Sequence, residues 1–330
     1  MQKDLLADFL HLYHSLGPGR KHLSELLAQF AGNPERILNS SAPALKACGL
    51  GHDTIVKLRS RQHPQVAADL AWAASGHNHL LCYCDRAYPE LLRQIPNAPA
   101  LLYAGGDLSL LHEPQIAIVG SRHCTPGGAQ NAFDFSLQLA AAGFTITSGM
   151  ALGIDSAAHR GALESGGKTI AVTGTGLDLV YPRRNQKLAR DILERGLMVS
   201  EFPLGTPARP ANFPQRNRVI SGLALATLVV EAARRSGSLI TARLAAEQGR
   251  EVLAIPGSIH NPQSRGCHQL IRDGAAIVES PADIATELAG PASHLLDQQD
   301  SRADDCKLEL DSASRQLLDA IGYDPVNCDI

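Results

Sequence analysis

The sequence of 330 residues lacks any long apolar run. No stretch approaches the roughly 18–20 consecutive apolar residues that a membrane-spanning helix needs, so a transmembrane protein is excluded. The first 17 residues include Asp4, Asp8 and two histidines, and they have neither the apolar core nor the cleavage site of a secretory signal. Apolar residues make up 44% of the chain and charged residues 19%, which suits a packed core and excludes disorder throughout.

Paired cysteines and the familiar nucleotide motifs are also missing. The seven cysteines are an odd count in a long chain, which favours reduced thiols and a cytoplasmic protein. No G-x-x-x-x-G-K-[ST] occurs, so a P-loop NTPase is disfavoured. The turn at 120–128, which follows the first apolar run of the α/β region, reads GSRHCTPGG. It places Arg122 where the dinucleotide fingerprint requires glycine, so an ordinary dinucleotide site is disfavoured as well.

Hydrophobic periodicity divides the chain into five segments. Residues 1–75 carry apolar side chains at helical spacing between glycine-rich breaks, which predicts a small all-α domain. Residues 76–112 combine a short strand pattern with prolines and predict a connector. Residues 113–290 alternate short apolar runs with helical stretches. Residues 291–311 are polar and acidic, as in a linker, and residues 312–330 begin a further helix and turn.

The alternation over 113–290 predicts an α/β fold with a largely parallel sheet that has helices on both faces. The expected strands are 115–120, 144–149, 169–174, 197–201, 226–232, 251–257 and 275–280. The expected helices are 128–142, 155–165, 185–195, 238–248, 266–273 and 281–289. Because the crossovers are right-handed, the loops that follow the strands share one sheet edge, where such sheets bind ligands.

Five loops expected at that edge combine glycine with serine, threonine or arginine. Glycine lets backbone N–H groups approach a ligand closely, while hydroxyl and guanidinium groups bind phosphate oxygens. Each loop alone is also explained by a tight turn that needs small residues. The candidate phosphate-binding residues in these loops are Gly120, Ser121, Arg122, Ser148, Gly149, Gly174, Thr175, Gly176, Arg216, Asn217, Arg218, Ser236 and Gly237.

One part of the chain is strongly basic, although the formal net charge of the whole is only −3. Residues 180–218 hold eight basic and three acidic side chains. This local excess suggests an anionic partner bound at one place, and a solvated surface face is the alternative explanation.

Residues of zinc-ligand type occur together at His77, His79, Cys82 and Cys84. Eight consecutive residues rarely supply four tetrahedral ligands, so a half-buried strand is the preferred interpretation. We therefore predict no metal and no cofactor.

Candidate acid–base groups occur at Asp155, His159 and Glu231. Asp155 and His159 have the spacing of a carboxylate that orients a histidine base, but a helix-capping role for Asp155 is favoured. Glu231 is expected to hold Arg234 or Arg218 in place. No convincing order of nucleophile, base and acid is present, so the sequence does not indicate an enzyme.

Seven motifs in order resemble the DprA (Smf) family of bacterial DNA-processing proteins. They are G-S-R at Gly120–Arg122, S-G-x-A-x-G-I-D at Ser148–Asp155, G-T-G-L-D at Gly174–Asp178 with Tyr181-Pro182, F-P-x-R-N-R at Phe213–Arg218, E-A-x-x-R-S-G-S-L-I-T at Glu231–Thr241, I-P-G at Ile255–Gly257 and G-C-H-x-L-I at Gly266–Ile271. The resemblance implies an N-terminal domain of the SAM or helix-hairpin-helix type, an extended Rossmann-like domain, and a winged-helix-like domain beginning at residue 312.

The resemblance also implies a function without catalysis. The family binds single-stranded DNA without sequence preference, dimerises through its Rossmann-like domain and loads the recombinase RecA onto incoming DNA in natural transformation. Its DNA-contacting basic positions correspond to Arg122, Arg183 and Arg209 in this sequence. Phosphate contacts of this kind do not depend on base sequence.

Two further sets of positions follow from the same resemblance. An aromatic residue that stacks on a base in some members is replaced here by Gln186, and Phe213 or Tyr181 could substitute, although core positions are expected for both. Aromatic residues are only 4% of the chain, which favours an interface dominated by phosphate contacts. The family's dimer contact corresponds to His268 and Ile277.

The alternative function is that of a nucleotide phosphoribohydrolase of the lysine-decarboxylase-like (LOG) type, whose sheet is related. That family carries P-G-G-x-G-T-x-x-E, in which glutamate follows the glycines. Here Glu231 precedes the glycine of RRSGSLIT at 234–241, so the enzyme is disfavoured.

Overall fold

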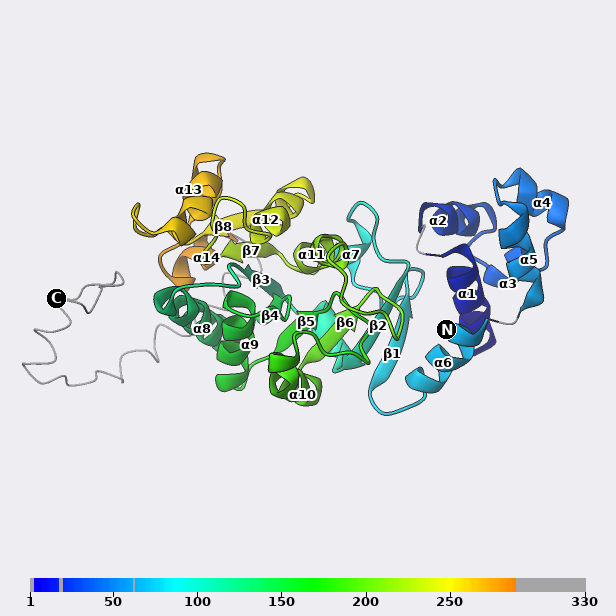
Figure 1. The fold of residues 1–330 in the computed structure, drawn as a ribbon, viewed down its shortest axis with the longest axis horizontal. Helices are drawn as coiled ribbons and strands as arrows, with labels where there is room; N and C mark the ends of the chain where they lie inside the picture. Colours follow the sequence, from blue (N-terminus) through cyan, green and yellow to red (C-terminus); the bar gives the residue numbers. More distant parts are fainter. Residues whose placement is uncertain (1–2, 18–19, 62, 289–330) are drawn as a thin grey trace, which may run out of the picture.

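The computed structural model describes residues 3–17, 20–61 and 63–288. Within these ranges a group of N-terminal helices lies beside one end of a long mixed sheet that is flanked by further helices (Figure 1). The linker expected over 291–311 and the winged-helix start expected over 312–330 lie outside the described residues. In the part that is described, no helix has the length and apolar character needed to cross a membrane.

The N-terminal helices enclose a small core of their own. They are α1 (Lys3–Leu16), α2 (Arg20–Gln29), α3 (Pro34–Leu38), α4 (Ala42–Ala47), α5 (His52–Ser60) and α6 (Pro64–Ala73). Two of the short helices begin at side-chain caps, since Asn33 and Ser41 accept hydrogen bonds from backbone N–H groups of α3 and α4. The buried face of α1 packs with Leu101 and Tyr103 of strand β2, so this helical part is anchored on the sheet.

The sheet has nine strands among the described residues. They are β1 (Asn78–Cys82), β2 (Leu101–Gly106), β3 (Gln115–Val119), β4 (Thr145–Ser148), β5 (Thr169–Val172), β6 (Leu197–Ser200), β7 (Ala226–Val229), β8 (Glu251–Ala254) and β9 (Ala276–Ile277). Their order is β1-β2-β6-β5-β4-β3-β7-β8-β9, with parallel pairing from β6 to β9 and antiparallel pairing of β1 with β2 and of β2 with β6. Residues 76–112, expected as a connector, thus supply two strands to the sheet.

Helices cover both faces of this sheet (Figure 1). They are α7 (Glu90–Arg93), α8 (Pro126–Ala141), α9 (Ile154–Glu164), α10 (Gln186–Arg195), α11 (Asn212–Leu223), α12 (Ser238–Glu247), α13 (Arg265–Arg272) and α14 (Pro281–Glu287), with 3₁₀ helices η1 (Leu108–His112), η2 (Arg183–Asn185) and η3 (Pro262–Ser264). In β3, Ile116 and Ile118 pack with α8 and α9, whereas Ala117 and Val119 pack with α11 and α12. A strand that is buried on both faces has apolar residues at consecutive positions, and β3 shows this pattern from Ile116 to Val119.

The sheet is largely parallel, as predicted, and its strand order reverses at β3. From β3 the chain continues to β4 on one side, whereas β7 pairs with β3 on the other side. The connections from β3 and from β7 therefore leave the sheet in opposite directions and open a crevice between them. The candidate site lies in this crevice.

Candidate functional site

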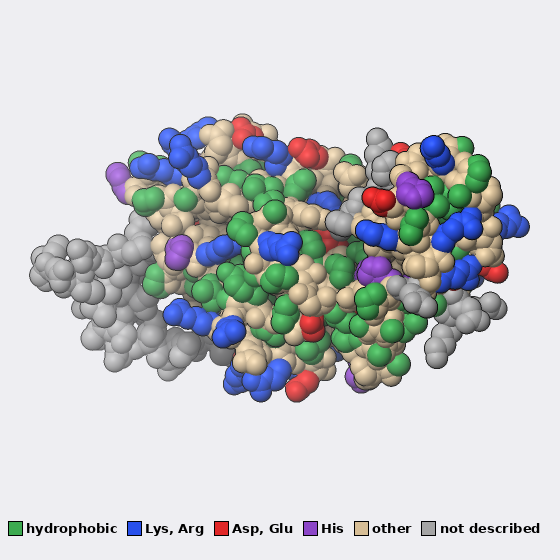
Figure 2. Space-filling model, turned by 45° about the vertical axis from the view of Figure 1, so that its right-hand side comes forward, with side chains coloured by type: hydrophobic (Ala, Val, Ile, Leu, Met, Phe, Trp, Pro, Cys, Tyr) green, Lys and Arg blue, Asp and Glu red, His purple; other side chains and the backbone are tan. Residues whose placement is uncertain are grey.

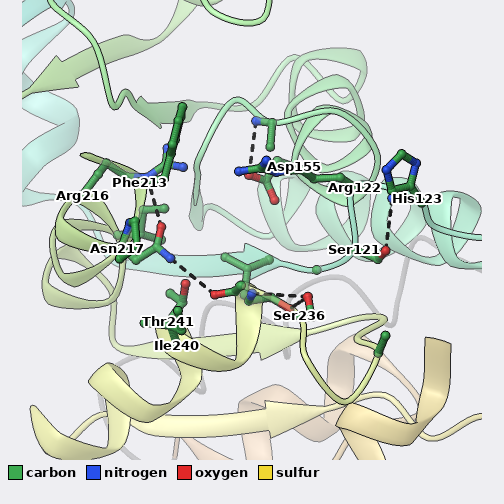
Figure 3. Close-up of a pocket in the computed structure, with 18 of the residues that line it drawn as sticks. Ser121, Arg122, His123, Asp155, Phe213, Arg216, Asn217, Ser236, Ile240 and Thr241 are labelled. Atoms are coloured by element: carbon green, nitrogen blue, oxygen red, sulfur yellow. Dashed lines mark hydrogen bonds between the residues drawn. The ribbon is translucent and has the colours of Figure 1, made fainter. Parts of the chain in front are cut away.

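A cavity of about 790 Å³ opens at the carboxyl ends of β3 and β7, where the strand order reverses (Figure 3). Its polar and aromatic lining residues include Gly120, Ser121, Arg122, His123, Asp155, Tyr181, Phe213, Arg216, Asn217, Arg235, Ser236, Gly237, Ser238 and Thr241. Figure 3 shows Phe213, Arg216 and Asn217 of α11 on one side, Ser236, Ile240 and Thr241 on another, and Arg122 with Asp155 above them. Seven of the predicted phosphate-binding residues thus meet in one cavity.

The loop after β3 forms one wall. Ser121 is fixed by its backbone N–H, which donates to the Glu231 carbonyl at 2.7 Å. Gly120 permits this close packing, because a Cβ there would lie 2.9 Å from the same carbonyl oxygen. The exposed Arg122 side chain lies over Phe213, with its Cζ 5.4 Å from the ring centroid, an attractive arrangement of cation and ring.

Arg216 forms the floor of the cavity. Its side chain is only 4% exposed and donates to the carbonyl oxygens of Gly149, at 2.5 Å, and of Val172. Burial lowers the pKa of Arg216 to about 10, so the guanidinium remains charged at neutral pH. Burial also raises the pKa of Asp155, while the positive charges of Arg216 and Arg122 oppose that rise. The cavity therefore holds a fixed positive charge.

Asp155 supports this floor and does not cap its helix in the predicted way. The N-cap of α9 is Gly153, and Asp155 stands in the first turn with its carboxylate accepting from the Ala151 N–H at 3.3 Å. A Cβ on Gly149 would lie 2.7 Å from both Arg216 Nη1 and Asp155 Oδ2. Gly149 thus leaves room for the two charged groups.

His159 does not face the cavity. It is fully buried, and its Nδ1 lies 2.7 Å from Thr169 Oγ1, whose hydroxyl donates to the Ile146 carbonyl. Burial lowers the pKa of His159 to about 3, so the imidazole is neutral. The acid–base pair considered from the sequence is therefore a packing arrangement beneath the site.

The loop after β7 and the start of α12 form the opposite wall. Ser236 and Ser238 lie with their Oγ atoms 2.7 Å apart, and Asn217 Nδ2 donates to the Gly237 carbonyl at 3.4 Å. The N–H groups of Ser238, Leu239 and Ile240 donate to Ser236 and Gly237, so the start of α12 contributes its partial positive charge rather than free donors. Together with the exposed Arg235, this wall suits a phosphate group.

Two predicted hydroxyl ligands point elsewhere. Ser148 donates to the Ile118 carbonyl at 2.6 Å, and Thr175 donates to the Leu179 carbonyl at 2.8 Å. Both residues are buried, and neither lines the cavity. They hold the loops that bear the site instead of contacting a ligand.

The predicted glycines of the 174–176 loop have a similar supporting role. A Cβ on Gly174 would lie 3.0 Å from the Phe213 ring, and a Cβ on Gly176 would lie 2.6 Å from the Pro203 carbonyl oxygen. Gly174 allows α11 and its aromatic ring to approach the end of β5, and Gly176 allows the segment at Pro203 to approach the same loop.

Arg218 is also outside the cavity. Its Nη2 lies 2.6 Å from Glu201 Oε2, and both side chains are buried. The expectation that Glu231 holds Arg218 or Arg234 is wrong. Glu231 accepts instead from the backbone N–H and hydroxyl of Thr125, at 2.8 and 2.7 Å, and from Asn261 Nδ2 at 3.3 Å.

Arg183 and Arg209 are exposed near the cavity without lining it. Arg183 stands two residues after the lining residue Tyr181, and Arg209 stands between Ala208 and Pro210, which also line the cavity. Figure 2 shows Lys and Arg side chains in one group at the level of α10 and another at the level of α12 and α13, with few acidic side chains between them.

An aromatic pair, which the sequence interpretation placed in the core, borders the cavity. Tyr181 is 48% exposed, and its ring centroid lies 5.6 Å from that of Phe213, which is half-buried. Gln186, at the position of the family's stacking aromatic, is exposed at the start of α10. The exposure of Tyr181 could not be foreseen, because its loop has no regular periodicity.

The two positions matched to a dimer contact lie away from the cavity. Ile277 is 52% exposed on β9, the edge strand, and His268 on α13 has its Nε2 2.9 Å from the Gly257 carbonyl oxygen. Within the described ranges no group of three or more His, Cys, Asp or Glu side chains could hold a metal ion.

Comparison with known proteins agrees with these motifs. The family described as DNA recombination-mediator protein A matches residues 79–289. The chain belongs to this family. Its sequence is 45% identical over 248 residues to Protein Smf of Escherichia coli, a match covering 75% of this chain and 66% of that one. It is 48% identical over 203 residues to DNA processing protein DprA of Streptococcus pneumoniae, covering 62% and 72%.

Solved structures of recombination-mediator relatives share the fold. The X-ray structure of DNA processing protein A from Streptococcus pneumoniae matches with a TM-score of 0.76 and 35% identity, covering 86% of this chain and 97% of that one. DNA processing protein A from Helicobacter pylori matches with a TM-score of 0.57 and 30% identity, covering 64% and 95%. The latter structure is described as revealing a unique single-stranded DNA binding mode of that protein.

Proposed function

We propose that the chain binds single-stranded DNA, without sequence preference, in this cavity and along the exposed arginines beside it. The proposal rests on the positive charge of the cavity. Arg122, Arg216 and Arg235 line it, whereas Asp155 is the one carboxylate among the lining residues. A DNA strand presents a regular series of negative phosphates, and arginine binds them with release of condensed counterions.

A single strand fits this arrangement better than a duplex. The charged floor formed by Arg216 is buried, so only a ligand that can enter the cavity reaches it. An unpaired strand can insert one nucleotide into a concave site, whereas a duplex presents a stiff, wide surface. Arg183 and Arg209 extend the positive surface outward, so phosphates on either side of the inserted nucleotide find partners. The binding mode described for the Helicobacter pylori relative supports this choice.

The proposed role of strand binding is to mediate recombination, with delivery of the strand to RecA during natural transformation. The protein acts as a homodimer in this proposal, with contacts through α13 and β9 at His268 and Ile277. An edge strand with an exposed isoleucine is open to pairing with a second copy. Two cavities in one dimer would strengthen binding to one long strand through avidity.

A catalytic role is not part of the proposal. The hydrolase alternative needs a free glutamate in the nucleotide site, but Glu231 is engaged by Thr125 and Asn261 and does not line the cavity. We expect no hydrolysis of nucleoside monophosphates by the purified protein, and release of ribose 5-phosphate would favour the enzyme.

Binding of fluorescent oligo-dT, compared with a duplex of the same length across a salt series, tests the proposal. The variant Arg122→Ala/Arg183→Ala/Arg209→Ala should flatten the log–log salt dependence by about 2, since each phosphate contact to a single strand contributes roughly 0.7. The control Lys57→Ala/Arg160→Ala/Lys168→Ala removes three exposed cations that do not line the cavity and should keep the slope. Equal slopes for the two triple variants would overturn the site assignment, and a preference for duplex would overturn the proposed ligand.

A further inference from the structure

Tyr181 is an exposed aromatic ring at the mouth of a positively charged cavity. Of the Phe, Tyr and Trp side chains in the described ranges, only Tyr83 and Tyr181 are exposed, at 37% and 48%. Tyr83 packs beside Tyr88 and under Arg93, and it does not line the cavity. Tyr181 lines the cavity, so much of its ring remains open to whatever enters.

The loop that carries Tyr181 is held in place at both ends. Before the tyrosine, the Thr175 hydroxyl donates to the Leu179 carbonyl at 2.8 Å. After it, the Asn185 amide donates to the Met150 carbonyl at 2.8 Å and to the Ser156 hydroxyl at 2.9 Å. The ring is therefore presented in a fixed position, and a ligand would not have to order the loop.

Phe213 supports Tyr181 and Arg122 together. Its ring lies 5.6 Å from the Tyr181 ring, at an interplanar angle of 42°, and beneath the Arg122 guanidinium. Gly174 closes off another side, since a Cβ there would be 3.0 Å from the phenyl Cδ1. Phe213 is half-buried among these groups and serves as a backing, whereas Tyr181 is 48% exposed.

We propose that Tyr181 is a stacking platform for one unpaired nucleobase of a bound strand, with Phe213 behind it. This inference rests on the proposed function. A base on Tyr181 would place its own nucleotide between the cation of Arg122 inside the cavity and that of Arg183 outside it. Every base has a π-face, so such a platform accepts any base sequence, whereas a duplex offers no unstacked face.

The experiment compares two strands that differ only in their bases. One is labelled oligo-dT, and the other is a strand of equal length and charge in which abasic residues replace the thymidines. The variants are Tyr181→Leu, which removes the ring and retains apolar bulk, and Tyr83→Leu as the matched exposed-tyrosine control. Loss of one stacked base should weaken oligo-dT binding by Tyr181→Leu about 5- to 150-fold. Binding of the abasic strand and the salt dependence should not change, because no phosphate contact is lost.

Arg122→Ala should affect the two strands alike, unlike Tyr181→Leu. It should weaken binding of both strands and reduce the salt slope, since it removes charge. The proposal is overturned if Tyr181→Leu binds oligo-dT as tightly as the unaltered chain, or if it loses oligo-dT and abasic strand by the same factor. If the unaltered chain binds neither strand, the proposed function fails together with the platform. If the chain binds both strands equally, the function stands and the platform fails.

A substituted fluorophore provides a second readout. Tyr181→Trp retains an aromatic ring, so it should bind oligo-dT within a few-fold of the unaltered chain, and its added fluorescence should be quenched by oligo-dT but not by the abasic strand. Trp72 is the chain's one natural tryptophan, and it packs near Tyr103 in the helical part, so the unaltered chain supplies the background signal. Equal quenching by both strands would contradict stacking.

Discussion

Arg218 and Glu201 form a buried ion pair, with Arg218 Nη2 2.6 Å from Glu201 Oε2, that joins α11 to the end of β6. The carbonyl oxygen of Glu201 also accepts from the Tyr13 hydroxyl of α1 at 3.1 Å. One residue therefore contacts both the N-terminal helices and the helix that carries Arg216 and Asn217. Arg218 is predicted from the sequence to bind phosphate, but it lies outside the cavity and holds α11 in place.

Replacement of Arg218 should thus destabilise the fold. Arg218→Ala leaves the buried Glu201 carboxylate without its arginine, which costs about 3–5 kcal/mol when one partner of such a pair is removed. Urea denaturation measures the loss in the free energy of unfolding. Arg235→Ala, which removes an exposed arginine, should change it by less than about 0.5 kcal/mol. An Arg218→Ala variant as stable as Arg235→Ala would show that the ion pair has no structural role.

Had α11 been predicted, the sequence would have shown that Arg216 and Arg218 point in different directions. From the sequence, Phe213–Arg218 is expected to be a loop. In the structure these residues belong to α11, and Pro214 occupies its first turn, where its missing N–H has no cost. Residues two apart on a helix do not share a face. Arg216 and Arg218 therefore cannot both face the cavity, and the sequence alone does not say which one does.

The strands were predictable for a different reason. Runs such as Gln115–Val119 and Ala226–Val229 are buried on both faces, so their apolar character is continuous and their ends are marked by glycine or charge. This apolar pattern does not indicate where a neighbouring serine hydroxyl points. Ser148 ends β4 and Ser236 lies in the loop after β7, each close to a glycine. The Ser148 hydroxyl donates to a backbone carbonyl, whereas Ser236 lines the cavity.

Gly149 is a sensitive position for the site. In Gly149→Ala the new Cβ would lie 2.7 Å from Arg216 Nη1 and Asp155 Oδ2, so the buried charged floor has to shift. We expect a loss of about 1–3 kcal/mol in stability, together with weaker strand binding. Gly127→Ala at the start of α8 is the matched control, because the nearest atom to its Cβ is 3.9 Å away. Thermal unfolding and oligo-dT binding of the two variants measure the contrast, and equal behaviour would contradict the packing argument.

The junction between the N-terminal helices and the sheet should depend on Tyr103. Its hydroxyl donates to Asp69 Oδ2 at 2.7 Å, and Asp69 is fully buried and also lies 2.6 Å from His14 Nε2. Tyr103→Phe removes a hydrogen bond to a buried carboxylate and should cost about 1.5–3 kcal/mol. Hydrogen exchange should then accelerate most in α1 and α6, which hold His14 and Asp69. Uniform acceleration over the whole chain would contradict a local role, and Tyr83→Phe at an exposed tyrosine should have little effect.

Acid should destabilise the protein partly through His159. Burial holds its pKa at about 3, whereas an unfolded chain has a histidine pKa near 6.5. Below pH 6.5 the unfolded state takes up a proton that the folded state does not, so this contribution to stability is complete above pH 6.5 and falls by about 1.4 kcal/mol for each pH unit below it. At pH 5 the loss is about 2 kcal/mol. His159→Gln removes that proton uptake, so its unfolding free energy should decline less steeply between pH 6.5 and 5 than that of the unaltered chain. His123→Gln, at an exposed histidine, should retain the original slope, and a His159→Gln slope equal to it would mean that the imidazole is not kept neutral by burial.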